Sequence, residues 1–302
     1  MSNITIIVEE EFEGLRLDKF LSGQDLGLTR TALQKLIENG GVLVNDKNIT
    51  KNYKQKSGDI IKISIPKPKS LDVIAENIPI EVVYEDEDLI IVNKPKGMVV
   101  HPANGNYTGT LVNALLYRYE GNLSTINGDI RQGIVHRIDK NTSGLLIVAK
   151  NDEAHIYLAE QIKSHSFTRE YEAITWGRFK DKSGTIDLPI GRSQFNRKKM
   201  CVTEKNSKTA ITHYEVLADY QKYTHLRIKL ETGRTHQIRV HMAHIGHYIL
   251  GDDIYGKAFK GIDGQCLHAK RIGFIHPTTK KYMNFESSLP DYFIEMIRRV
   301  SN

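Results

Sequence analysis

One polar loop, within residues 131–150, carries the side chains best suited to catalysis. In the string RQGIVHRIDKNTSGLLIVAK, polar residues from His136 to Ser143 separate two apolar runs. Loops at strand ends commonly display catalytic side chains. The carboxylate of Asp139 could act there as a nucleophile or a general base. A turn or capping role is commoner for an Asp in such a loop, and the residues alone leave both roles open.

A second segment, residues 230–256, combines an amphipathic helix with a basic residue at its start. In LETGRTHQIRVHMAHIGHYILGDDIYG, apolar residues recur at helical spacing and predict a helix that begins near Thr235. Arg234 stands at its positive end, where a side chain can hold a carboxylate or a phosphate. The segment also contains four histidines, namely His236, His241, His244 and His247. Without an HExxH pattern, a cysteine or an acidic third ligand, structural roles are favoured over a metal site.

Two further strings place single polar residues beside apolar strands. KPKGMVVHP, residues 94–102, predicts a turn after a strand, and TREYEAITWG, residues 168–177, places Tyr171 in a strand. Taken one at a time, such lysines and tyrosines are usually structural. The His-Arg-x-Asp order at residues 136–139 is similar to that of the kinase catalytic loop. The sequence has no Gly-rich phosphate loop and no DFG string, which excludes phosphoryl transfer of the kinase type.

The elements that must position these segments alternate irregularly beyond residue 80. Strands are predicted at residues 80–84, 89–93, 145–149, 170–176, 210–217, 223–230, 267–275 and 281–285, and helices at residues 110–119 and 153–163. This order lacks a regular βαβ rhythm. It therefore favours an α+β fold, in which a mixed, largely antiparallel sheet has flanking helices.

The first fifth of the chain differs from the rest in charge. The protein has 42 Lys and Arg against 36 Asp and Glu, a net charge of +6. Residues 14–69 hold 11 basic and 5 acidic side chains, so this region carries the whole excess. Two short helices, near residues 15–21 and 29–38, and strands in VLVN and GDIIKISIP predict a small αβ module. Its basic surface suits a polyanion, and a solvated lysine-rich face is the alternative.

Length and composition set the class of protein. A chain of 302 residues suits two domains, which we expect at residues 13–70 and 80–302, with a linker at residues 71–79. With 40% hydrophobic and 26% charged residues, it is expected to be soluble and globular, and no stretch approaches the roughly 18 apolar residues of a spanning helix. The acidic amino terminus does not resemble a secretory signal, and the 2 cysteines lack CxxC spacing. These features predict a cytoplasmic protein with free thiols.

The motifs occur together in a known family. From Ile80 onward the chain resembles the pseudouridine synthases of ribosomal or transfer RNA, in the branch with the HRLDxxTSGL motif. The matching strings are KPKGMVVHP, GIVHRIDKNTSGLLIVAK, TREYEAI, TGRTHQIRVHMAHIGH, GDDIYG and LHAKRIGFIHP. Residues 15–62 resemble the RNA-binding module of small-subunit ribosomal protein four. The resemblance implies an enzyme that isomerises specific uridines to pseudouridine, above all in large-subunit ribosomal RNA.

The resemblance also assigns roles to individual residues. Asp139 would act on the flipped-out uridine as nucleophile or base, Arg234 would pair with it, and Tyr171 would stack on the uracil and relay the final proton. Arg137 would fill the gap that the flipped base leaves. Further RNA or substrate contacts are expected for His136, Leu267, Lys270, the run Arg197, Lys198 and Lys199, and the module residues Arg16, Lys19, Arg30 and Lys35.

An isomerisation needs no redox partner, nucleotide or metal by stoichiometry, so no cofactor is expected. RNA is the expected partner, with no membrane and no obligate protein partner. Transfer RNA is the alternative substrate. Two other classes are kept as alternatives: a ribosome-assembly factor that binds RNA without modifying it, and a hydrolase that acts on RNA through metal-bound water.

Overall fold

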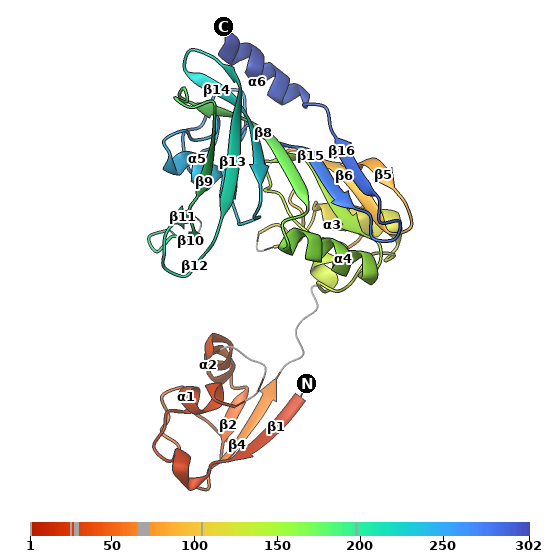
Figure 1. Cartoon of the computed structure of the whole chain (residues 1–302). Helices are drawn as coiled ribbons and strands as arrows, with labels where there is room; N and C mark the ends of the chain where they lie inside the picture. Colours follow the sequence, from red (N-terminus) through yellow and green to blue (C-terminus); the bar gives the residue numbers. More distant parts are fainter. Residues whose placement is uncertain (1, 25, 27–29, 66–72, 104, 197–198) are drawn as a thin grey trace. The chain divides into compact units, whose positions relative to one another are not determined.

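The chain divides into two compact units, residues 1–70 and 71–302 (Figure 1). The computed structural model describes residues 2–24, 26, 30–65, 73–103, 105–196 and 199–302. None of the helices within these ranges is long and apolar enough to cross a membrane.

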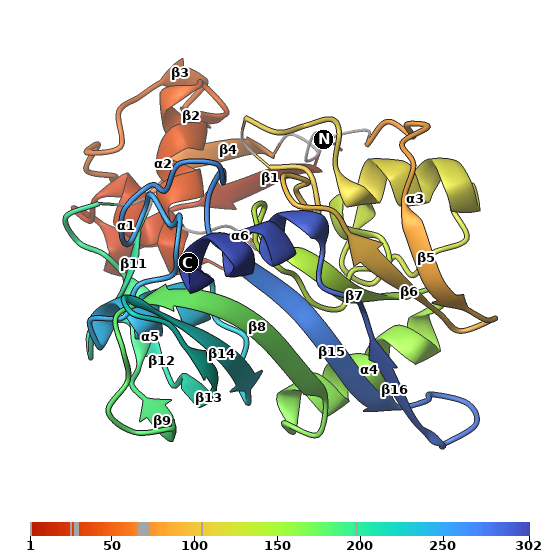
Figure 2. The same ribbon diagram turned by 90° about the horizontal axis from the view of Figure 1, so that it is seen from above.

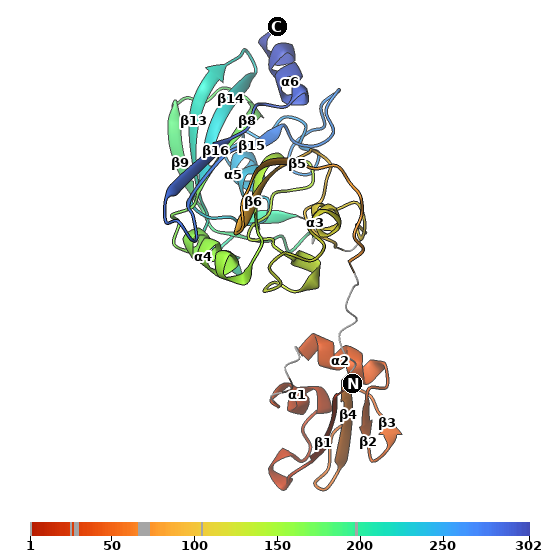
Figure 3. The ribbon, with the colours of Figure 1, turned by 90° about the vertical axis from the view of Figure 1, so that its right-hand side faces the viewer.

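The first unit is a four-stranded antiparallel sheet with two short helices (Figure 3). Its elements are β1 (Ser2–Ile7), the 3₁₀ turn η1 (Glu10–Phe12), α1 (Leu17–Ser22), α2 (Arg30–Glu38), β2 (Val42–Val44), β3 (Lys47–Asn48) and β4 (Ile60–Ile65). The strand order is β1-β4-β2-β3. Leu17 and Leu21 of α1 pack on Ile61 and Ile63 of β4 in a separate core. The module was expected to start at residue 13. It starts earlier, because β1 pairs with β4 and is therefore part of this sheet.

The second unit is built on a nine-stranded sheet that is antiparallel except for one pair. Its strands are β5 (Glu81–Glu85), β6 (Leu89–Lys94), β7 (Ser143–Ala149), β8 (Thr168–Trp176), β9 (Ser183–Asp187), β13 (Ile211–Asp219), β14 (Tyr223–Leu230), β15 (Leu267–Ile275) and β16 (Tyr282–Glu286). The order is β5-β6-β7-β15-β8-β14-β13-β9, and β16 pairs with β15. The α+β fold and its largely antiparallel sheet are as the sequence predicts.

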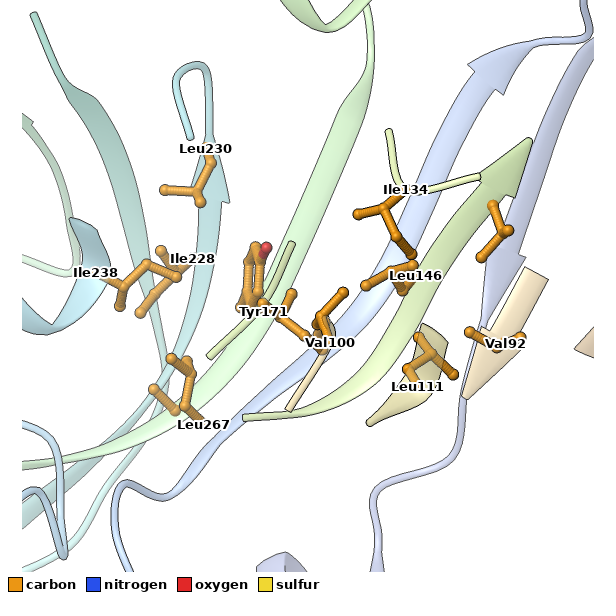
Figure 4. Packing of buried hydrophobic residues seen from close by; sticks show 14 of the residues in the cluster. Val92, Val100, Leu111, Ile134, Leu146, Tyr171, Ile228, Leu230, Ile238 and Leu267 are labelled. Atoms are coloured by element: carbon orange, nitrogen blue, oxygen red, sulfur yellow. The ribbon is translucent and has the colours of Figure 1, made fainter. Parts of the chain in front are cut away.

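Helices cover both faces of this sheet, because its strands send alternate side chains to opposite sides. On one face, α3 (Leu111–Tyr119) and α5 (Gln237–His244) join a core with Val92 and Tyr171 (Figure 4). The helix α4 (Asp152–Lys163) packs on Leu89 of β6 and Ile147 of β7, and α6 (Asp291–Ser301) packs on Ile174, on the face of β8 opposite to Tyr171 (Figure 2). The face of α3 and α5 carries the polar loop that contains Asp139.

Three features of this unit were not predicted from the sequence. They are the helix α6, the strand β9, and a small sheet of β10 (Ile190–Arg192), β11 (Met200–Val202) and β12 (Ser207–Lys208). The segment at residues 71–79, expected to be a linker, contacts the second unit from residue 73 onward. The side-chain amide of Asn113 donates to the carbonyl of Ile74 at 2.7 Å, and Val73 packs on the core. Residues from 73 onward therefore belong to the second unit.

Gly144 permits the single parallel contact in the sheet. Strands β7 and β15 meet only at Ser143–Gly144 and His268–Ala269. A Cβ atom on Gly144 would lie 2.2 Å from the carbonyl oxygen of Ala269, and its φ of +112° is one that other residues rarely adopt. The glycine of the TSGL string thus lets β7, which follows the Asp139 loop, lie against β15.

Candidate active site

One cavity of about 490 Å³ gathers most of the polar residues that the sequence singled out. Its wall is formed by the loop at residues 135–142, strand β8, the segment 230–239 and the start of β15. Asp139, Tyr171, Leu267, His136, Arg137 and Arg234 all line it. Tyr171 and Leu267 reach it from the core (Figure 4). Segments far apart in the sequence therefore meet at one site.

The carboxylate of Asp139 is held at this wall by a buried arginine of α5. Nη1 of Arg239 donates to Oδ2 of Asp139 at 3.1 Å, while Nε and Nη2 donate to the two carboxylate oxygens of Asp252 at 2.7 and 2.9 Å. The Arg239 side chain is 4% exposed and that of Asp252 is 0% exposed. Burial disfavours the charge on Arg239, but both carboxylates outweigh it and raise its pKa. A permanently charged guanidinium thus fixes the direction of Asp139.

The GDDIYG string supplies the support behind this arginine. Oδ1 of Asp252 also accepts the backbone N–H groups of Ile254 and Tyr255, each at 3.1 Å. Burial alone would raise the pKa of Asp252, but these hydrogen bonds and Arg239 lower it. Asp252 therefore stays ionised. It holds Arg239 from behind, so that Arg239 binds Asp252 and Asp139 at the same time.

Arg239, and not Arg234, is the partner of Asp139. Nε of Arg234 donates to the carbonyl of Thr209 at 2.8 Å, and the helix begins at Gln237 after His236 in the left-handed region, with φ of 58°. The Gln237 side chain accepts the backbone N–H of Arg234 at 2.9 Å and so fixes the turn. The turn directs Arg234 to another part of the cavity. A lone arginine inside an otherwise buried helical stretch was the signal for Arg239 that the sequence analysis missed.

Two lysines of the KPKG string hold the backbone that follows Asp139. Nζ of Lys94 donates to the carbonyl oxygens of Pro95, Met98 and Lys140 at 2.9, 2.8 and 3.2 Å. Nζ of Lys96 donates to those of Asn141 and Gln265 at 2.9 and 2.6 Å. Lys94 is 1% exposed, and burial lowers its pKa to about 7. Both lysines position the loop, a role that was not assigned from the sequence.

Tyr171 and His136 are neutral groups at the cavity wall. Burial raises the pKa of Tyr171, so its hydroxyl keeps its proton. Nε2 of His136 accepts the backbone N–H of Ile147 at 3.2 Å, and burial lowers its pKa to about 3. His136 also lies 5.6 Å, ring to ring, from Phe167. It is therefore a neutral support of the loop that also lines the cavity.

Arg137 is exposed and rests on a neutral histidine. Its Nη1 lies 3.4 Å from Nε2 of His101, a buried residue of the KPKGMVVHP string. Burial, reinforced by Arg137, lowers the pKa of His101 to about 4, so its ring can accept from the guanidinium. Arg137 is thus in contact with a neutral histidine while its side chain remains exposed at the cavity wall.

Lys270 does not line the cavity, contrary to the expectation. Its Nζ contacts the carbonyl of Ser287 and lies 3.0 Å from Oε1 of Glu286. Because Leu267 faces the cavity, strand alternation directs Lys270 to the opposite face. Of the expected phosphate run, Arg197 and Lys198 lie outside the described residues, and Nζ of Lys199 lies 5.9 Å from the centre of the Tyr255 ring.

In the first unit, the expected RNA contacts differ in their surroundings. Arg16 donates through two nitrogens to the buried carboxylate of Asp18, at 3.0 and 3.1 Å. Lys19 and Lys35 are exposed, and the side chain of Arg30 lies outside the described residues. Arg16 is therefore fixed by an ion pair, whereas Lys19 and Lys35 are exposed, and their RNA contacts stay a prediction.

The described residues contain one group with the composition of a metal site, made of Asp86, Asp88 and His276. It is not part of the cavity wall. Nδ1 of His276 accepts the backbone N–H groups of Thr278 and Thr279, so Nε2 carries the proton and donates to Asp86 at 2.8 Å. This histidine has no free lone pair for a metal.

The histidines of the 230–256 segment are held by hydrogen bonds. Both ring nitrogens of His241 have partners, Thr212 Oγ1 and the Leu188 carbonyl, each at 2.9 Å. Nδ1 of His236 lies 2.8 Å from the Tyr255 hydroxyl, and Nδ1 of His247 lies 3.0 Å from the Trp176 carbonyl. Structural roles fit His241 and His247, whereas His236 lines the cavity with its Nε2 3.9 Å from Oδ1 of Asp139.

The cavity thus combines a fixed carboxylate, a buried aromatic ring and several cations. A carboxylate held by an arginine can act as a nucleophile or base, and the ring and cations suit a nucleotide with its phosphates. Together with a basic αβ unit in the same chain, the site defines an enzyme that acts on RNA.

Comparison with known proteins gives the particular family. The chain matches the family described as RNA pseudouridylate synthase over residues 88–244 and the S4 domain over residues 15–61. The uncharacterized RNA pseudouridine synthase YlyB of Bacillus subtilis is 48% identical over 302 residues, with 99% of each chain covered. The ribosomal large subunit pseudouridine synthase D of Zymomonas mobilis is 46% identical, over 94% of this chain and 93% of its own. The protein belongs to the RNA pseudouridylate synthase family and isomerises uridine in RNA to pseudouridine.

A solved structure agrees on the fold. Human RNA pseudouridylate synthase domain containing 1 aligns with a TM-score of 0.57 at 24% identity, over 78% of this chain and 97% of its own. The predicted family, S4-like module and activity are confirmed by these comparisons. The alternatives of a hydrolase and of a non-catalytic assembly factor are therefore set aside.

Proposed function

We propose that Asp139 is the catalytic carboxylate. Among the described residues that line the cavity, it carries the only carboxylate, and this observation supports the proposal most strongly. The reaction breaks the bond between C1′ of the ribose and N1 of uracil, joins C1′ to C5, and moves the C5 proton away. One ionised carboxylate beside the ribose can serve as the nucleophile or the base that this sequence needs.

The neighbours of Asp139 then have separate tasks. Arg239 holds the carboxylate in position through the hydrogen bond from its Nη1. Tyr171 offers its ring to the uracil, and its protonated hydroxyl is available to relay the last proton. Exposed Arg137 fills the space that the uridine leaves when it flips, which offsets part of the few kcal/mol that unstacking costs.

Replacing Asp139 with Asn tests this assignment. The side chain keeps its shape and loses its charge, so pseudouridine formation should fall at least about a hundredfold while RNA affinity changes little. Glu170→Gln is the matched control, because Glu170 lies in the same sheet but lines a groove on the other face. Activity of Asp139→Asn within tenfold of the wild type would contradict the proposal.

We further propose that the substrate is large-subunit ribosomal RNA, which would place the enzyme in the cytoplasm. Relatives named ribosomal large subunit pseudouridine synthase D, from Zymomonas mobilis and Haemophilus influenzae, are 46% and 41% identical to this chain. Pseudouridine mapping of all stable RNA, in cells with and without the gene, checks this. Loss of modification confined to transfer RNA would support the alternative substrate.

A further inference from the structure

The guanidinium of Arg169 is a buried cation that the proposed chemistry does not use. Arg169 belongs to β8, lines the cavity and is only 4% exposed. Its Nη2 donates to the carbonyl of Glu231 at 2.9 Å, and its buried Nε has no hydrogen-bond partner. No ion pair joins it to a carboxylate of the described residues. A buried charge without an ion pair and with an unused hydrogen-bond donor destabilises the folded protein unless a ligand supplies the missing partner.

The surrounding turn is shaped around this guanidinium. A Cβ atom on Gly233 would lie 2.5 Å from Nη1 of Arg169, so a larger residue there would displace the end of the Arg169 side chain. The turn itself is fixed because the side-chain carbonyl of Gln237 accepts the Thr232 hydroxyl at 2.8 Å and the Arg234 backbone N–H at 2.9 Å. The position of Arg169 is therefore preorganised.

Other cations line the same part of the cavity. They are Arg234, whose Nε is satisfied by a carbonyl, and Lys163 at the end of α4, whose Nζ lies 3.5 Å from the exposed carboxylate of Glu160. Arg239 differs, because two carboxylates neutralise it. Arg169 and Arg234 thus carry charges that no ion pair with a carboxylate of the described residues neutralises.

Strand geometry separates Arg169 from the uracil position. Residues 169 and 171 point to the same face of β8, and an extended strand spaces them by about 7 Å. A base that stacks on Tyr171 next to Asp139 leaves Arg169 for another group of the same RNA strand. The anionic groups of that strand are its phosphates.

We propose that Arg169, together with Arg234, binds a backbone phosphate adjacent to the uridine that enters the cavity. The inference rests on the proposed function only in taking Asp139 and Tyr171 as the uridine position. The phosphate completes the hydrogen bonds of a guanidinium that the protein leaves unfinished, and it draws the RNA strand toward the cavity.

Charge-neutral linkages test this directly. The probe is a synthetic RNA stem-loop containing a uridine that mapping identifies as a target, and a series of the same RNA with one methylphosphonate linkage at each position near that uridine. One linkage should weaken binding to the full-length wild type roughly tenfold, the loss expected for one charged hydrogen bond. The same linkage should have little effect on Arg169→Gln.

Kinetics separate this role from chemistry. Arg169→Gln should raise KM roughly tenfold, leave kcat within about threefold, and reduce the log–log salt slope of binding by about 0.7 to 0.9. Arg169→Lys should recover part of the affinity. Arg271→Gln removes an exposed cation from the opposite face and should change none of these values.

Three results would overturn the proposal. They are equal methylphosphonate effects in wild type and Arg169→Gln, an unchanged salt slope, or a loss in kcat alone, which would assign Arg169 to a uracil oxygen. If Arg169→Gln does not fold, the same comparison is made with Arg169→Lys and Arg234→Gln. Binding needs no turnover, so an active Asp139→Asn enzyme would refute the catalytic assignment without affecting this test.

Discussion

The two faces of strand β8 carry hollows of similar size and opposite electrical character. Arg169 and Tyr171 line the cavity of about 490 Å³, whereas Glu170 and Glu172 line a groove of about 450 Å³ on the other side. The same strand builds both walls, because its side chains alternate between the faces. What differs is how the charges on each face are partnered.

Charges in the groove are balanced by one another. Its acids are Glu170, Glu172, Glu215 and Glu286, and its Lys and Arg residues are Arg227, Lys229, Lys270 and Arg271. Arg227 pairs with Glu215 at 2.8 Å, and Lys270 pairs with Glu286 at 3.0 Å. In the cavity, cations outnumber the single carboxylate. The two faces thus differ in how many of their basic residues a carboxylate already pairs with.

Arg239→Gln is expected to have the largest effect on both stability and turnover. It removes the partner of Asp139 and leaves Asp252 buried without a counter-charge, which typically costs about 3 to 5 kcal/mol of the free energy of unfolding. Turnover should fall at least about a hundredfold, because Asp139 loses its direction. Urea unfolding and a pseudouridine assay measure the two effects.

The matched control on the other face is Arg227→Gln. Arg227 and Glu215 form an exposed pair, with side chains 47% and 55% exposed, so their loss should cost less than about 1 kcal/mol. Equal destabilisation by Arg239→Gln and Arg227→Gln would contradict the distinction between the faces.

Lys94 should make the free energy of unfolding depend on pH. Because burial lowers its pKa to about 7 from 10.5, the unfolded chain holds the Lys94 proton over this interval while the folded protein releases it. The unfolded state then binds more protons, so the free energy of unfolding should rise with pH, by up to about 1.4 kcal/mol per unit, relative to Lys94→Met. Urea titrations of both proteins between pH 6 and 9 measure this slope.

The slope for Lys94 has a clear counter-result. If the difference between wild type and Lys94→Met does not change with pH, the three carbonyl groups keep Lys94 charged throughout. In either case Lys94→Met should lower turnover, since the loop after Asp139 loses its hydrogen bond at Lys140 and the KPKG turn loses those at Pro95 and Met98.

The smallest expected effect concerns Lys270. Because Lys270 lies on the balanced face, Lys270→Gln should leave kcat, KM and the salt slope of RNA binding within about twofold of the wild type. Arg234→Gln, in the cavity, should raise KM instead. A fall in RNA affinity for Lys270→Gln equal to that for Arg234→Gln would mean that the groove also contacts RNA.

Much of the architecture could be read from the sequence. Alternation and helical spacing predict the major strands, the helices α3, α4 and α5, and the basic αβ unit. Strand β1 and the small sheet of β10, β11 and β12 were missed, because short strands carry too few residues for a clear period and take their partners from distant segments. The segment from residue 73 looked like a linker until the side chain of Asn113 bound it to the second unit.

The candidate site shows the same division. The resemblance to the family indicates Asp139 and Tyr171, because the motif strings that contain them can be read directly from the sequence. Strand alternation was also enough to separate Leu267 from Lys270, although this signal was overlooked.

Only the tertiary structure decided which arginine serves Asp139. The sequence analysis named Arg234, and the choice between Arg234 and Arg239 depends on where the helix begins. That point is set by the left-handed backbone of His236 and by the Gln237 side chain, and it is completed by Asp252 from a later loop. Charge pairing is a property of distances between segments remote in the chain, and the order of residues does not contain those distances.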